Sequence, residues 1–259
     1  MKFAEGLNNY KIKINGIEIS FSCRFIPSSE EMILFLHGLG CSKESFRNVF
    51  DKHYFNNKTL LFVDLPGFGE SSKTESFSYS MENCAEIIEG VVSLLPEMKI
   101  HIAAHSMGGA VGLLFSDKFF EKVISFANIE GNLISEDCGL LSRGIISSCY
   151  ENYKNSLYIS QVKEFAGHDQ LKFGSTTPFV LYKCAESLVK WSDSGKLLAK
   201  FRSLKCRKCY FYGRLNSGMP VLKKLEGIES VMIEECGHAM MTENPDGFYR
   251  KLEQFINFE

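Results

Sequence analysis

The stretch Ala104-His105-Ser106-Met107-Gly108 decides the fold, because it places a serine between small residues where a strand gives way to a helix. Residues 99–104 (KIHIAA) have the pattern of a short buried strand, and residues 109–115 (GAVGLLF) that of the first turns of a helix. Such a sharp turn crowds the residues two positions before and after the serine, so both must be small. The pattern predicts a nucleophile elbow that presents the Ser106 hydroxyl. The alternative is a glycine-rich loop with an incidental serine, since short motifs also match by chance.

Three further motifs follow apolar strands in the order that the chemistry of a nucleophilic serine requires. An early strand ends in residues 37–40 (HGLG), a glycine turn that can expose backbone N–H groups to an oxyanion. The next strand runs into residues 64–71 (DLPGFGES). A late strand is followed by residues 236–238 (CGH), and a histidine on such a loop is a candidate base.

With these four motifs in this order, spread from about residue 32 to the C-terminus, the chain resembles the α/β-hydrolase fold family. The resemblance implies that Ser106 is the nucleophile and His238 the catalytic histidine. It also implies that the backbone N–H groups of Leu39 and Met107 bind the oxyanion. The turn at Asp64 corresponds to a structural feature of the family, and we expect its carboxylate to cap its own loop.

The order of the predicted elements gives the same fold class. We predict helices over about residues 80–95 and 246–256, where apolar residues recur at helical spacing. Strands that alternate with helices predict an α/β fold with a doubly wound, mostly parallel, eight-stranded sheet. The predicted strands are short and mostly apolar, as suits a sheet that is covered on both faces: residues 10–15, 17–25, 32–36, 59–63, 99–104, 122–129, 208–212 and 229–233.

Residues 131–202 interrupt this alternation and are rich in Ser, Tyr, Phe, Leu and Lys. We expect them to form a helical cap inserted into an α/β-hydrolase core of residues 1–130 and 203–259. In the family that the chain resembles, such an insertion commonly follows strand 6 and closes over the serine. Binding specificity is then expected in residues 140–191.

The sequence motifs do not by themselves identify the residues that line the substrate pocket. Four residues are expected to line it: His37, Gly38 and Met240, which lie beside the catalytic motifs, and Trp191 in the cap. Each has an alternative place in the packed core, where methionine is a common gap-filler and cap aromatics pack against one another.

The acid that orients the catalytic histidine has two candidate positions. In many members of the family it follows the strand-7 glycine by about three residues, but here that position holds Asn216, which can accept a hydrogen bond and carries no charge. A second acid position, known from some haloalkane dehalogenases, lies at the end of strand 6, and there this chain has Glu130. The order Ser106, Glu130, His238 keeps the family order, so we predict Glu130 as the acid. Its alternative is to cap a cap helix or pair with Arg143.

These residues together predict acyl transfer to water through an acyl-enzyme. His238 would remove the proton of Ser106 as the serine oxygen attacks a carbonyl, and Glu130 would orient the imidazole. The predicted activity is that of a carboxylesterase on a small-molecule ester with a small to medium apolar acyl group. Thioesterase, lactonase and C–C bond hydrolase activities stay open. An alternative from another functional class is a ligand-binding protein without efficient turnover. Asn216, at the usual position of the acid, is the reason to consider it.

Composition and charge limit the kinds of partner that we expect for this protein. The 259 residues include 29 basic and 31 acidic ones, and without a long basic run we expect no nucleic-acid partner. No segment approaches the roughly 18 apolar residues that span a bilayer, and no signal peptide is evident, so we expect a cytoplasmic protein. Nine irregularly spaced cysteines predict reduced thiols. Cys206 and Cys209 have ligand spacing but no second pair, so neither a metal nor another cofactor is predicted.

Overall fold

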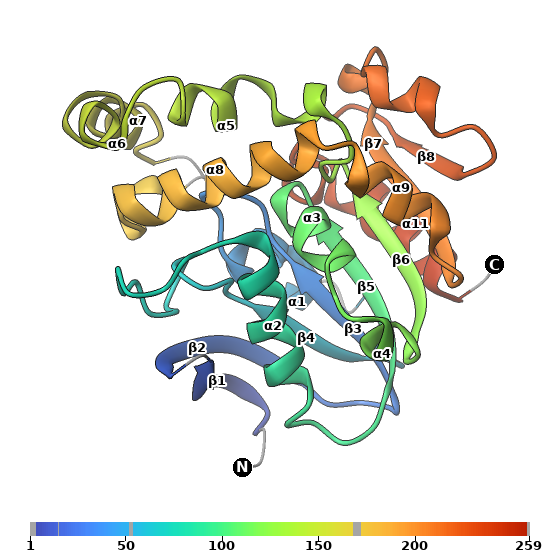
Figure 1. Ribbon diagram of the computed structural model, residues 1–259. Helices are drawn as coiled ribbons and strands as arrows, with labels where there is room; N and C mark the ends of the chain where they lie inside the picture. The colour runs from blue at the N-terminus through green and yellow to red at the C-terminus, as the bar shows by residue number, and fades with distance from the viewer. Residues whose placement is uncertain (1–3, 15, 52–53, 168–171, 258–259) are drawn as a thin grey trace.

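One eight-stranded sheet runs through the middle of the molecule (Figure 1). The computed structural model describes residues 4–14, 16–51, 54–167 and 172–257. The strand order is β1-β2-β4-β3-β5-β6-β7-β8; β1 and β2 form an antiparallel hairpin, β2 runs antiparallel to β4, and all other neighbours are parallel. The predicted α/β class, the mostly parallel sheet and its eight strands are therefore confirmed. The strands are β1 (Gly6–Ile14), β2 (Ile17–Ile26), β3 (Glu31–Leu36), β4 (Thr59–Val63), β5 (Lys99–His105), β6 (Val123–Ile129), β7 (Arg207–Gly213) and β8 (Glu229–Ile233).

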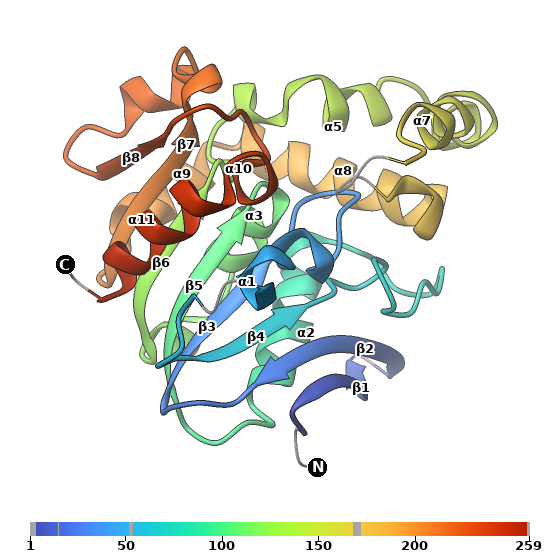
Figure 2. The same ribbon diagram turned by 180° about the vertical axis from the view of Figure 1, so that it is seen from behind.

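Helices cover both faces of the sheet. On the face turned forward in Figure 1 lie α2 (Met81–Val92), α3 (Met107–Leu113), α4 (Asp117–Phe120) and α9 (Lys196–Ser203). Figure 2 shows the opposite face, with α1 (Asn48–Asp51), α10 (Met240–Glu243) and α11 (Pro245–Asn257).

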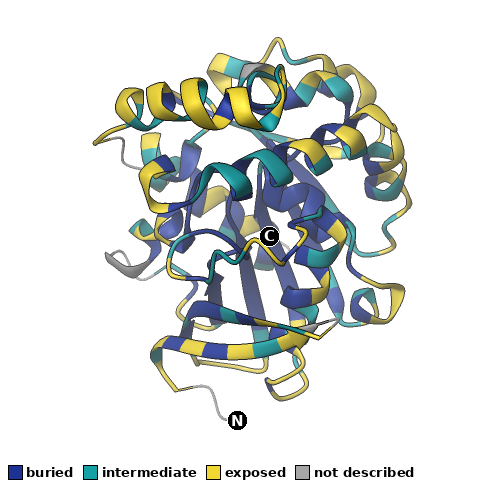
Figure 3. Cartoon of the chain, turned by 60° about the vertical axis from the view of Figure 1, so that its left-hand side comes forward, coloured by how far each residue is buried: buried dark blue, intermediate teal, exposed yellow. Residues whose placement is uncertain are grey.

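The two faces of the sheet belong to two separate apolar cores. Along β3, Leu34 and Leu36 point into the core beneath α2 and α3, whereas Ile33 and Phe35 point into the core beneath α11. Burial on both faces is why this strand reads as a continuous apolar run. Figure 3 shows the central strands as a buried layer and, at the edge of the sheet, a β1–β2 hairpin along which exposed and buried residues alternate.

The chain between β6 and β7 is helical. It contains α5 (Gly139–Ile145), α6 (Tyr150–Asn152), α7 (Tyr158–Glu164) and α8 (Pro178–Asp193), which lie beyond the sheet edge where β6 ends, followed by α9 (Figure 1). Helix α9 returns to the sheet, where the ring of Phe201 lies 6.0 Å from that of Phe126 on β6. The division of the chain into a core and a separate cap at residues 131–202 stays a prediction. None of the described helices is long and apolar enough to cross a membrane.

The turn that follows β4 is held together by Asp64. Its buried carboxylate accepts hydrogen bonds from the backbone N–H groups of Lys43, at 2.8 Å, and Glu70, at 2.9 Å, and pairs with the Lys43 ammonium at 2.6 Å. These bonds tie the turn after β4 to the turn after β3. Asp64 therefore joins two loops at the edge where the parallel strands end, the edge at which open α/β sheets bind ligands.

Candidate active site

Ser106 stands on a strained turn between β5 and α3. Its backbone has φ of 52° and ψ of −122°, in a region that residues other than glycine rarely adopt. The turn has room because the residue that packs against it in space is a glycine: a Cβ on Gly38, in the turn after β3, would lie 3.0 Å from the Cβ of Ser106. This is the backbone geometry of a nucleophile elbow.

Gly108→Ala is expected to lower the free energy of unfolding by about 3 kcal/mol. The new Cβ would stand 2.6 Å from the carbonyl oxygen of Leu36 and 2.8 Å from that of His37, and these backbone atoms at the end of β3 cannot move aside. Gly144→Ala is the matched control, since a Cβ at that glycine of α5 meets nothing within 4 Å. The control is expected to be neutral or stabilising by up to about 1 kcal/mol. Urea unfolding measures both, and equal effects would contradict the prediction.

Glu130 directly follows β6 and meets the imidazole of His238. The His238 Nδ1 lies 2.7 Å from Glu130 Oε2. The glutamate side chain is fully buried, and its oxygens also accept the Gly213 N–H at 2.9 Å and the Asn216 side-chain amide at 2.8 and 3.0 Å. Hydrogen bonds to both oxygens compensate for burying the carboxylate.

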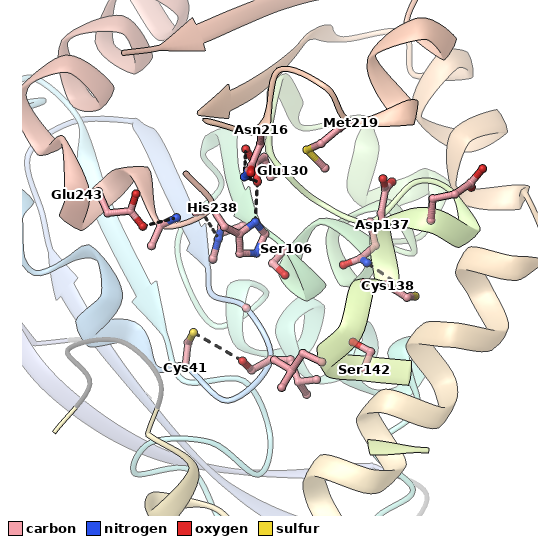
Figure 4. Close-up of a pocket in the computed structure, with 18 residues that line it drawn as sticks. Cys41, Ser106, Glu130, Asp137, Cys138, Ser142, Asn216, Met219, His238 and Glu243 are labelled. Atoms are coloured by element: carbon pink, nitrogen blue, oxygen red, sulfur yellow. Dashed lines mark hydrogen bonds and ion pairs between the residues drawn. The ribbon is translucent and has the colours of Figure 1, made fainter. Parts of the chain in front are cut away.

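Asn216 stands at the position where many members of the family have the acid, but it does not contact His238 through a hydrogen bond. Its amide N–H groups point to Glu130, so the glutamate and not the asparagine carries the hydrogen bond to His238 (Figure 4). The asparagine amide donates to both carboxylate oxygens, including the Oε2 that meets His238, and so fixes the orientation of the carboxylate.

A cavity of about 460 Å³ opens beside Ser106, and its lining includes Glu130 and His238. Figure 4 shows the Ser106 side chain beside the imidazole, with Glu130 beyond the ring. The backbone N–H groups of Leu39 and Met107, which both line or adjoin this cavity, make no hydrogen bond within the described part of the chain. They are therefore available to an oxyanion, as α/β-hydrolases require.

His37 does not line the cavity, contrary to our expectation. It is completely buried, its Nε2 accepts the Leu65 N–H at 3.0 Å, and its Nδ1 lies 2.8 Å from the Gly38 carbonyl oxygen. Because Nε2 accepts, the proton is on Nδ1, which donates to Gly38. Burial lowers the pKa of His37 to about 4, so the ring is neutral. His37 braces the glycine turn instead of contacting a ligand.

Of the other residues expected in the pocket, Gly38 lines the cavity, whereas Met240 and Trp191 do not. Met240 begins α10 and is buried in the core beneath α11. Trp191, on α8, packs against the core on the opposite face of the sheet. Proximity to a motif in the sequence did not determine on which side of an element each side chain lies.

Two residues that sequence analysis missed hold the loop of His238. His105 Nε2 lies 3.0 Å from the His238 carbonyl oxygen, with the two rings 4.6 Å apart. Burial lowers the pKa of His105 well below its ordinary value. The Glu243 carboxylate accepts the N–H groups of Gly237, at 2.5 Å, and Ala239, at 3.3 Å. The sequence offered one signal for His105, namely its position next to Ser106. It offered no signal for Glu243, which lies five residues after His238.

The cavity also has a wall that the sequence revealed only in part, since Leu141 and Ser142 lie within residues 140–191, where binding specificity was expected. It is formed by residues that follow β6 and by residues of the loop after β7, namely Asn132, Asp137, Cys138, Leu141, Ser142 and Met219. The rule that ligands bind beyond the carboxyl ends of parallel strands was the signal for those that follow β6.

The paired cysteines lie away from this cavity. Cys209 is buried within β7 and Cys206 is half-buried just before it, and both thiols are free. Burial raises the pKa of each thiol. Among the described residues, no three His, Cys, Asp or Glu side chains are grouped so that they could hold a metal ion.

Comparison with known proteins agrees with the fold. Residues 31–145 match the family model described as the alpha/beta hydrolase fold. The uncharacterized hydrolase YugF of Bacillus subtilis is 28% identical over 121 residues, which are 44% of this chain and 42% of YugF, so less than half of that relative is matched. The 2-hydroxy-6-oxononadienedioate/2-hydroxy-6-oxononatrienedioate hydrolase of Escherichia coli K12 is 23% identical over 254 residues, 88% of this chain and 87% of the relative.

The structure is similar to that of a thermophilic esterase from Thermogutta terrifontis, with a TM-score of 0.77 at 17% identity over 97% of this chain and 98% of the esterase. At this identity the likeness concerns the fold. The sheet order, the turn that carries Ser106 and the family model matched by residues 31–145 all lead to one conclusion: the chain has the α/β-hydrolase fold.

Proposed function

We propose that this protein is a serine hydrolase that cleaves carboxylic esters through an acyl-enzyme. The observation that carries the proposal is the 2.7 Å contact between His238 Nδ1 and Glu130 Oε2, in the cavity that Ser106 also lines. A nucleophile, a base and a group that orients the base thus come from three segments to one place.

The chemistry follows from the tautomer that Glu130 selects. With its Nδ1–H donated to the carboxylate, His238 has Nε2 free to take the proton of Ser106 as the serine oxygen attacks the ester carbonyl carbon. The backbone N–H groups of Leu39 and Met107 stabilise the resulting oxyanion, at about 3–4 kcal/mol for each donor. His238 then protonates the departing alcohol, and a water molecule that it deprotonates hydrolyses the acyl-enzyme.

The cavity favours a small to medium, uncharged acyl group. Its volume is about 460 Å³, and Leu39, Leu141 and Met219 supply apolar surface. Four carboxylate side chains also line it, and no lysine or arginine does among the described residues. A dicarboxylate such as the dienedioate named for the E. coli relative would meet like charges there, which favours ester over C–C bond hydrolysis.

Labelling with a fluorophosphonate tests the proposal. The wild-type protein is expected to gain one covalent adduct by intact mass and to hydrolyse p-nitrophenyl butanoate, and Ser106→Ala is expected to lose both. Wild-type protein that stays folded by circular dichroism yet gains no adduct would support the alternative of a ligand-binding protein without turnover.

Asn216→Ala is expected to lower kcat only about tenfold, because it removes hydrogen bonds to Glu130 but leaves the Gly213 N–H and His238 in place. Steady-state kinetics on p-nitrophenyl butanoate measure this. A loss as large as that of Ser106→Ala would mean that the asparagine, not the glutamate, is the essential partner.

A further inference from the structure

We propose that Asn132 and Asp137 form an acceptor wall, which selects ligands that carry a hydrogen-bond donor, such as a hydroxyl group, and no negative charge. This inference rests on the proposed function in one respect: it takes the ligand to be an ester. The two side chains take no part in the proposed catalytic steps.

Asn132 presents a buried acceptor beside the serine. The residue is 3% exposed and lines the cavity, and its backbone N–H donates to the Ser106 carbonyl oxygen at 3.4 Å. Its side-chain Nδ2 lies 3.9 Å from Cys138 Sγ, whereas its Oδ1 has no hydrogen-bond partner in the described part of the chain. A buried amide oxygen without a partner is a costly arrangement unless a ligand supplies a donor.

Asp137, which is labelled in Figure 4, lines the same cavity and provides a second acceptor. One of its oxygens, Oδ2, accepts the backbone N–H groups of Leu133 at 2.8 Å and Ile134 at 3.0 Å, which fixes the carboxylate. The other, Oδ1, is buried and has no partner among the described residues. The side chain is thus held by one oxygen and offers the other.

The rest of the lining determines which ligand fits. Glu130, Glu136 and Glu243 also line the cavity, and no lysine or arginine among the described residues does, so the protein itself offers no cation to the free acceptors. A ligand hydroxyl satisfies them, whereas a ligand carboxylate adds a charge of the same sign. A site with unpaired acceptors also rejects an otherwise identical ligand whose hydroxyl is replaced by a methyl group.

Binding to Ser106→Ala tests the inference without turnover. The probes are ethyl 3-hydroxybutanoate for the acyl side and 2-hydroxyethyl butanoate for the alcohol side. Each has a counterpart with a methoxy group and one with a methyl group in place of the hydroxyl. Ligand-observed NMR titration is expected to give a Kd roughly tenfold lower for the hydroxyl ester than for both counterparts on one of the two sides.

Two variants assign the preference to the wall. In the Ser106→Ala background, Asn132→Leu removes one acceptor, and Asp137→Asn keeps an oxygen for the two backbone amides but replaces the free oxygen with a donor. Each is expected to reduce the hydroxyl preference to about twofold or less. Asp193→Asn is the matched control, because Asp193 pairs with Arg143 on the surface and does not line the cavity, and it is expected to keep the full preference.

The outcomes separate this inference from the proposed function. Equal affinity for the hydroxyl, methoxy and methyl esters, or a preference that survives both wall variants, overturns the acceptor wall. Tighter binding of the methoxy esters does so as well, since it would identify a donor at this wall. Wild-type protein that shows the hydroxyl preference but hydrolyses no ester overturns only the proposed hydrolase activity.

Discussion

Glu130→Gln is expected to lower kcat by at least several hundredfold, and up to about 10⁴-fold, with KM nearly unchanged. The glutamine amide would place its oxygen toward the Gly213 N–H and the Asn216 amide, which both require an acceptor, and its NH₂ toward His238. The imidazole Nδ1 would then have to accept, so the proton would move to Nε2, where it prevents the ring from taking the proton of Ser106.

Kinetics on p-nitrophenyl butanoate, with thermal unfolding as a check on the fold, measure this effect. Asn216→Ala, which changes the same cluster without changing the tautomer of His238, is the control, and its loss of kcat should stay at about tenfold. Glu130→Gln protein with near-normal kcat would remove Glu130 from the catalytic machinery.

Acid is expected to destabilise the protein between pH 6.5 and 4 because three of its histidines are buried in the neutral form. Burial lowers the pKa values of His37 and His101 to about 4 and that of His105 well below its ordinary value. The unfolded chain takes up these protons near pH 6.5 and the folded chain does not, so the stabilisation is fully present above pH 6.5 and is lost as the pH falls toward 4. His37 and His101 each account for about 3 kcal/mol of this loss.

Asp137 works in the opposite direction. Burial raises its pKa to about 6, so the folded protein takes up this proton before the unfolded chain does and gains about 3 kcal/mol as the pH falls from 6 to 4. The net loss is still expected to exceed about 3 kcal/mol at pH 4, and Asp137→Asn should steepen it. Urea unfolding between pH 7.5 and 4 measures both proteins, and a flat wild-type profile between pH 6.5 and 5 would refute the expectation.

The sheet was predictable because each strand carries its own local signal. Parallel strands covered on both faces are short, continuous apolar runs, and β3, β4 and β5 each end in a motif rich in glycine or small residues that marks the boundary. The placement of Glu130 was predictable for the same reason, since it depends only on where β6 ends.

The wall of the cavity was not predictable in this way. His37 and Met240 adjoin catalytic motifs, yet the side of the chain on which each lies is set by contacts with residues far away in the sequence, such as Leu65 for His37. Asn132 and Asp137 are polar residues at the start of a helical segment, and only the folded chain shows that an oxygen of each lacks a partner. Local pattern determines strands; the lining of a cavity depends on tertiary packing.

The three proposed catalytic side chains differ in how firmly the backbone holds them. The N–H of Ser106 donates to the Ile129 carbonyl on β6 at 3.0 Å, and that of Glu130 donates to the Phe211 carbonyl on β7 at 2.9 Å. The nucleophile and the acid therefore stay in place as long as the sheet does. His238 is on a loop, and local opening of that loop alone would give a folded but inactive state. Amide hydrogen exchange should then be faster around His238 than at Ser106, and the population of the open state would limit the fraction of active molecules at any moment.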